Sequence, residues 1–173
     1  MRLILFAALA LVPAAARAAH AGDWVQSDAL GTNLWTHNFN TNHDATIADA
    51  FGLSEFVGLH CFFADDWRVG MSLQFTEQLA PDPANGASRF TTFAFLPQVG
   101  WVFHKPFFAQ ITVAIPVRTG GENVIDFGLQ AIFGASFPLT ERVSASLALE
   151  IPFYFKLHDT VGATPLAGIA WRL

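Results

Sequence analysis

The sequence predicts an eight-stranded antiparallel up-and-down transmembrane β-barrel, preceded by a cleaved signal peptide. Successive segments alternate apolar and polar residues with a period of two, which is typical of strands that separate two unlike environments. The connections between these segments are short and long in turn. Hydrophobic residues make up 53% of the chain and charged residues 13%, yet no spanning-length apolar stretch follows the N-terminal region. A closed barrel is then the structure that satisfies its backbone hydrogen bonds in lipid.

The N-terminal segment has the features of a secretory signal peptide. Arg2 precedes an apolar run over residues 3–12, and small residues with Ala-x-Ala sites follow up to Ala21. The run is shorter than the roughly 20 residues of a membrane-spanning helix, which argues against the alternative of a membrane anchor. We therefore assign residues 1–21 to the signal peptide, 22–30 to a short periplasmic segment and 31–173 to the barrel.

The first strand is predicted at residues 31–39. This segment contains β-forming residues but no clean alternation. We place the strand there because an even number of strands brings both chain ends to the periplasm.

Four alternating segments follow, at residues 51–63, 68–77, 92–103 and 107–118. In the second of them Val69, Met71 and Leu73 would face lipid. Pro97 interrupts the third, and a proline removes one hydrogen-bond donor from the sheet. It predicts a local defect in pairing, with a bulge or a lateral opening as the alternatives.

The last three strands are predicted at residues 125–137, 142–156 and 164–173, the middle one with the cleanest alternation. Residues 64–66, 104–106 and 138–141 form the short connections, whereas residues 40–50, 79–89, 119–123 and 157–163 form the long ones. In outer-membrane barrels the short turns face the periplasm and the long loops face outward. Aromatic residues near both ends of the strands predict two interfacial girdles.

A soluble barrel of lipocalin type is the main alternative architecture. A soluble surface carries roughly a quarter to a third charged residues, whereas the polar phase here is mostly Gly, Ser, Thr, Ala and Gln. Eight strands leave a core just wide enough for side chains, and the apolar phase holds too many large aromatics to fit inside. The composition therefore favours the membrane barrel.

The inward phase carries charged residues that would have to be paired or hydrated. Glu150 lies nearest the middle of its strand and is the predicted centre of a lumen ion network. A lumen filled by side chains is favoured over a gated polar pathway, because eight strands leave no open channel. The predicted network consists of Arg68, Arg118, Asp126, Glu150, Lys156 and Arg172.

No catalytic, cofactor or metal site is predicted, and the protein is expected not to be an enzyme. Ser54 and His60 share a face but stand about 20 Å apart at the rise of a strand, too far for a nucleophile and its base. The net charge of −5 argues against nucleic acid,. No spacing diagnostic of a metal site links the histidines and aspartates near the long loops, which are His37, His43, Asp44, His158 and Asp159,.

The final strand carries a resemblance to a known group of proteins. Residues 31–173 resemble the small outer-membrane β-barrel superfamily of OmpA-, OmpX- and OmpW-like eight-stranded proteins. Members of this group end in a strand with an aromatic residue two positions before a terminal aromatic, which the barrel-assembly machinery reads. Trp171 matches this pattern, and Leu173 stands where Phe or Trp is usual.

The resemblance implies a protein of the Gram-negative outer membrane that contacts its lipids and the barrel-assembly machinery. We expect a monomer with a mostly side-chain-filled lumen, a structural or surface-interaction role, and loops that contact an extracellular partner. The alternative is transport of small or apolar solutes along a narrow or lateral path.

Overall fold

The computed structural model describes residues 20–40, 42–46, 52–78, 91–119, 124–155 and 160–173. Within these ranges, no helix is long and apolar enough to cross a membrane. The described strands are β1 (Trp24–Thr32), β2 (Trp35–Asn38), β3 (His43–Thr46), β4 (Gly52–Ala64), β5 (Trp67–Gln78), β6 (Thr91–His104), β7 (Phe107–Thr119), β8 (Val124–Ile125), β9 (Gly128–Pro138), β10 (Val143–Tyr154) and β11 (Thr160–Arg172).

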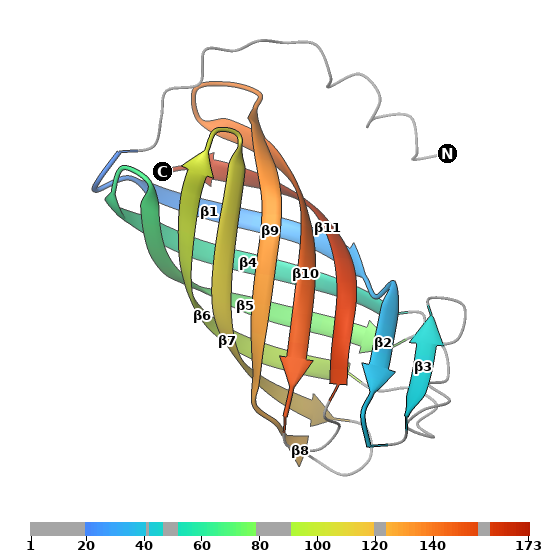
Figure 1. Cartoon of the computed structure of the whole chain (residues 1–173). Helices are drawn as coiled ribbons and strands as arrows, with labels where there is room; N and C mark the ends of the chain where they lie inside the picture. Colours follow the sequence, from blue (N-terminus) through green and yellow to red (C-terminus); the bar gives the residue numbers. More distant parts are fainter. Residues whose placement is uncertain (1–19, 41, 47–51, 79–90, 120–123, 156–159) are drawn as a thin grey trace.

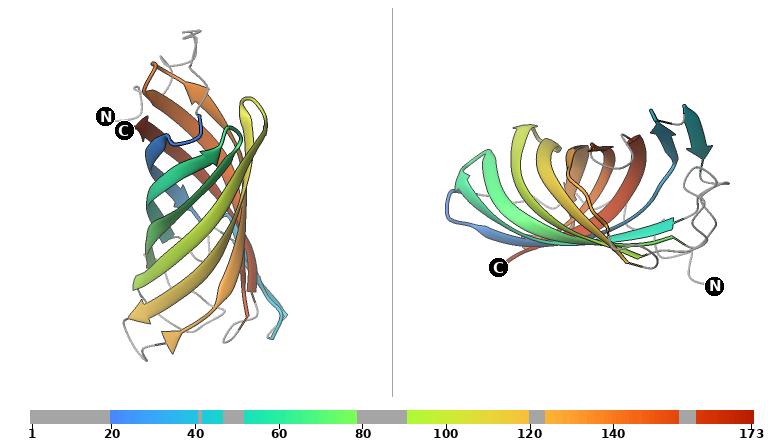
Figure 2. Two further views of the ribbon diagram at one scale, coloured as in Figure 1. Left: turned by 90° about the vertical axis from the view of Figure 1, so that its left-hand side faces the viewer. Right: turned by 90° about the horizontal axis from the view of Figure 1, so that it is seen from below.

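Eight of these strands form a closed ring in the order β1-β4-β5-β6-β7-β9-β10-β11, because β1 pairs antiparallel with both β4 and β11. The strands tilt around a common axis (Figure 1), and two further views show the curved sheet from the side and from below (Figure 2). Because the sheet closes on itself, it encloses a lumen. Beyond the end of β1, the β2–β3 hairpin pairs with β11, and β8 pairs with β7. The predicted eight-stranded barrel is confirmed.

The two ends of the barrel differ in their connections. The β4–β5, β6–β7 and β9–β10 turns lie at one end together with the C-terminus and residues 20–24, and we call this the short-turn end (Figure 1). The Leu173 amide donates to the Trp24 carbonyl over 2.9 Å there. The β2–β3 hairpin lies at the opposite, long-loop end. In outer-membrane barrels the short-turn end faces the periplasm.

The first strand begins at Trp24, so its predicted start at residue 31 was wrong, and most of the predicted periplasmic segment 22–30 lies in the barrel wall. The sequence pattern missed this start because two residues on the outward face of β1 are polar. They are Gln26 and Asp28, and Asp28 lies directly opposite two outward apolar residues, Val57 and Ile169. These polar residues remove the alternation that identified the other strands. The predicted signal peptide lies outside the described residues except for positions 20 and 21.

Pro97 causes a local defect without a bulge. It pairs in register with Met71 of β5. Toward β7, the ladder keeps one register from residue 91 to residue 102 and omits only the pairs at residues 96 and 97. The register shifts that do occur lie beside two short turns, between Phe62 and Ala64 and between Val102 and His104. The alternatives of a bulge or a lateral opening at Pro97 therefore have no support in the pairing.

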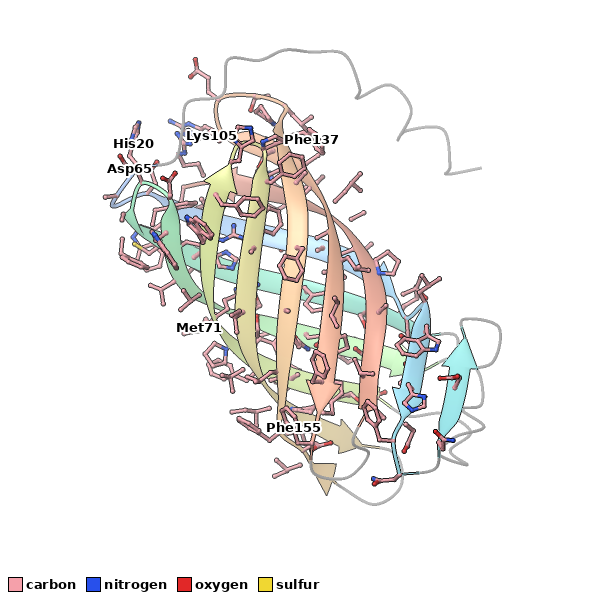
Figure 3. All side chains as sticks on the ribbon, viewed as in Figure 1. His20, Asp65, Met71, Lys105, Phe137 and Phe155 are labelled. Atoms are coloured by element: carbon pink, nitrogen blue, oxygen red, sulfur yellow. The ribbon has the colours of Figure 1, made fainter. Side chains whose placement is uncertain are left out.

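The outer surface of the barrel is apolar and rich in aromatic residues. Met71, Phe137 and Phe155 lie on three different parts of it (Figure 3), and each of their side chains is exposed. Near the short-turn end, a chain of ring contacts joins neighbouring strands, with centroid separations of 5.7, 5.4 and 6.4 Å between successive rings. The rings belong to Trp67, Trp101, Phe103 and Phe107. A belt of this kind suits the lipid interface of a transmembrane barrel.

Candidate functional site in the barrel lumen

An apolar layer crosses the middle of the lumen. Phe56 of β4, Leu96 of β6 and Ile132 of β9 pack into one buried cluster, which Leu166 of β11 completes. These strands are spaced around the ring, so their side chains meet across it. Leu96 is only 1% exposed. Buried apolar contact of this kind fills the cross-section with side chains rather than water.

The short-turn half of the lumen contains a chain of polar side chains. Arg68 donates through Nη2 to the Gln110 side-chain oxygen over 3.0 Å. The Gln110 amide nitrogen in turn donates to the Gln98 oxygen, and the Gln98 amide nitrogen contacts His60 Nε2 and the Ser72 hydroxyl. Each amide thus uses both its donor and its acceptor, which fixes its orientation.

The long-loop half contains a second polar group. Gln130 is fully buried, and its amide nitrogen donates to Gln74 Oε1 over 3.1 Å and to the Tyr154 hydroxyl over 3.2 Å. Glu150, on the neighbouring β10, is 1% exposed, and its Oε1 has no hydrogen-bond partner among the described residues. Ser54 and Thr76 share a hydrogen bond of 2.8 Å nearer the loops.

The described residues of the predicted ion network are divided between the two halves of the barrel, and Asp126 and Arg118 are neighbours at the loop end, where the Asp126 amide donates to the Pro116 carbonyl and Val124 pairs with Arg118. Arg68 contacts Gln110, and Arg172 lies with Nε 3.4 Å from Asp23 Oδ2. No salt bridge between members of the predicted network occurs among the described side chains. Asp126 is buried and accepts from the backbone amide of Phe127, Arg118 stands near the loop end of β7, and Lys156 lies outside the described residues.

The polar groups that sequence reasoning missed are uncharged. Gln98, Gln110 and Gln130 carry most of the lumen hydrogen bonds. They lie on the inward phase of their strands, which was visible in the alternation, but a search restricted to charged residues passed over them. A count of inward amides would have found them.

The described residue pairs that could carry chemistry do not form a site, and His158 and Asp159 lie outside the described residues. Ser54 contacts Thr76, whereas His60 contacts Gln98, so the two stay apart as expected. His37 Nδ1 lies 2.7 Å from Asp44 Oδ1 across the β2–β3 hairpin. In the described part of the chain, no group of three or more His, Cys, Asp or Glu residues is arranged to hold a metal ion.

The residues of the predicted assembly signal lie in the wall that closes the barrel. Trp171 faces outward between Gln26 of β1 and Val143 of β10. Leu173 is 72% exposed at the short-turn end. Their recognition by the assembly machinery stays a prediction.

Comparison with known proteins adds to this geometry. The sequence matches no known protein family and no curated protein. Neisserial surface protein A (NspA) has a TM-score of 0.59 with 15% identity, covering 88% of this chain and 98% of that one. Ail, the attachment invasion locus protein of Yersinia pestis, in complex with the heparin analogue sucrose octasulfate, has a TM-score of 0.58 with 13% identity, covering 88% of this chain and 99% of that one. The outer membrane protein OprG from Pseudomonas aeruginosa has a TM-score of 0.53 with 10% identity, covering 89% of this chain and 97% of that one.

The chain therefore has the fold of the small eight-stranded outer-membrane β-barrels. Its apolar outer belt and short-turn end agree with that class, and together they support a place in the outer membrane. The named proteins differ in role, so the fold alone leaves the role of this chain to its own surfaces.

Proposed function

We propose that this protein is an outer-membrane barrel with a closed lumen, which acts as a structural or surface-interaction element and not as a channel. The observation that carries the proposal is the packed layer across the lumen. Leu96, Gln130 and Glu150 come from three strands and are each at most 1% exposed at mid-barrel. An open aqueous path would leave such side chains in contact with water.

The long-loop end offers a surface for contact. On the β2–β3 hairpin, the rings of Trp35, His37 and Phe39 lie in a row, with centroids 6.1 and 4.8 Å apart. The Phe39 side chain is 58% exposed. Exposed aromatic groups on a hairpin suit either a lipid interface or a protein partner. Ail and NspA, which are named as an attachment protein and a surface protein, support a role at this surface.

Conductance across a planar bilayer tests the proposal. The folded wild-type protein is expected to give no stable unitary current steps. A variant with a trimmed layer, Phe56→Ser combined with Leu96→Ser, should give steps and show that the assay detects an open lumen. Migration in gels with and without boiling would check that each variant is folded.

Stable wild-type steps that disappear in Glu150→Gln or Arg68→Gln would refute the closed lumen. That result would favour the alternative of a narrow transport path through the polar groups.

A further inference from the structure

We propose that a cavity at the short-turn end of the lumen binds a soluble phosphate-type anion. The site goes beyond the proposed function, which depends on the closed layer deeper in the barrel. The cavity measures about 390 Å³, within the range of small-molecule sites,. We call it the cationic pocket, and its charged lining residues are Arg68, Lys105, Arg142, Arg172, Asp65 and Glu141.

Arg68 is the cation of this pocket that lies deepest in the lumen and has no charged partner among the described residues. Its guanidinium lies over the Phe108 ring, with Cζ 5.0 Å from the ring centroid, and among the described side chains it donates only to the neutral Gln110. Its Nε is shielded from solvent and has no hydrogen-bond partner. None of the described carboxylates forms a salt bridge with it. A partly buried cation without an anion is unfavourable, and a bound anion would relieve this.

Two glycines make room for this arrangement. A Cβ atom at Gly100 would lie 2.7 Å from Arg68 Nε, and one at Gly134 would lie 2.7 Å from Phe108 Cζ. Arg68 and Phe108 therefore lie flat across neighbouring strands where only glycine permits such a close approach. The hydrogen bond to Gln110 also holds the guanidinium in place. The donor is thus positioned before any ligand arrives.

The rim of the pocket adds further positive charge. Lys105 comes from the β6–β7 turn and Arg142 from the β9–β10 turn, and both are exposed. Lys105 and Asp65 lie at the same end of the barrel (Figure 3). The lining has four cationic and two anionic side chains, and one of the cations, Arg172, already has Asp23 beside it. Arg68, Lys105 and Arg142 are the remaining cations, against Asp65 and Glu141. A charged mouth with low-dielectric walls attracts ions of opposite sign.

The chemistry favours a multiply charged oxyanion. A guanidinium presents a planar fork that matches phosphate and carboxylate oxygens, and several nearby cations favour the higher charge of a phosphate. The pocket is lined by inward-facing strand residues and turn residues, such as Ser136, Ser144 and Thr140. A ligand therefore reaches it from the aqueous end and not from the lipid, so we assign a soluble phosphate compound and not a lipid headgroup.

Titration calorimetry of the full chain, folded in dodecyl maltoside, tests this site with inorganic phosphate and pyrophosphate as probes. The detergent carries no phosphate. We expect saturable binding that Arg68→Gln weakens by about tenfold or more, since hydrogen bonds to charged groups are the strong ones. Lys105→Gln, on an exposed turn, should weaken it by about two- to fivefold. The matched control is Arg118→Gln, which removes the same charge at the far end of β7 and should leave binding unchanged.

Gly100→Ala provides a test without a change in charge. The added methyl group would displace Arg68, so binding should weaken while the net charge and boiling-dependent gel mobility stay the same. The inference would be overturned if the wild type shows no saturable binding, or if Arg118→Gln weakens binding as much as Arg68→Gln. In bilayers containing phosphatidylglycerol, phosphate binding should persist. Its suppression by that lipid would overturn the assignment to a soluble ligand.

Discussion

The outer faces of β1 and β5 differ although both strands belong to the same closed sheet. Around the middle of β5 the outward residues are Val69, Met71 and Leu73, and these three are apolar and exposed. On β1 the corresponding positions include Gln26 and Asp28. The comparison is direct because Asp28 pairs with Val57 of β4, which pairs with Leu73 of β5 in the same row.

The difference shows that backbone closure outweighs side-chain chemistry at β1. This strand makes seven register pairs with β11 and nine with β4. Opening it would leave two rows of unpaired backbone groups in lipid, where each costs several kcal/mol. Asp28 remains on the outer face even though its Oδ1 is shielded and finds no hydrogen-bond partner in the described part of the chain. The ladder thus holds a strand that hydrophobicity alone would not place in the membrane.

The largest effect is expected from moving a charge onto the apolar strand. Leu73→Arg should lower the free energy of unfolding by about 2–4 kcal/mol, because a cation near the bilayer midplane must leave water. Equilibrium unfolding in urea, in phospholipid vesicles, measures this change. Leu73→Phe, which keeps the position apolar, is the control. A loss as large in the control would show that packing, and not charge, decides the cost.

Removing the charge from β1 should have a smaller effect of opposite sign. Asp28→Leu should raise the free energy of unfolding by about 1–2 kcal/mol, since acidic residues on the lipid face cost less than basic ones. The same urea experiment applies. Asp28→Asn keeps a polar group and should recover only part of the gain. A destabilised Asp28→Leu would mean that this carboxylate has a favourable contact in the membrane.

The smallest effect is expected at Glu55, another acidic residue on the outer face. It pairs with Leu30 and Phe75 and lies three residues from the long-loop end of β4. Because the cost of a charge falls toward the interface, Glu55→Leu should gain about 0–1 kcal/mol. If Glu55→Leu raised the free energy of unfolding as much as Asp28→Leu does, the cost of a charge would not depend on its depth at these two positions. Both residues would then lie at the same level in the bilayer.

Local patterning predicted most of the wall of the barrel. Seven of the predicted strands agree with observed strands to within a few residues, and the short turns fall where the sequence placed them. At Pro97 the missing amide predicted a local loss of pairing, and the pairing lapses there without a change of register. These features depend on neighbouring residues in the chain, so the sequence displays them directly.

The lumen was predicted less well. Arg68 and Glu150 were correctly assigned to the inward phase, but their union in one ion network has no support among the described contacts. The partner of Arg68 is Gln110, which lies 42 residues away and two strands along the sheet. Alternation tells which face a residue occupies but not which residue stands beside it, because height in the barrel depends on the register of every intervening strand.

By itself, the sequence determined that the chain forms strands with a lipid face and a lumen face, and that short turns gather at one end. Both follow from a two-residue period and from turn lengths, which are local properties. Only the tertiary structure decided that β1 starts at Trp24 and that Arg68 lies over Gly100 and Phe108 beside a cavity. The physical reason is that the barrel closes through backbone hydrogen bonds between β1 and β11. This pairing fixes the position of each residue, including polar residues that hydrophobicity alone would not place on the outer face.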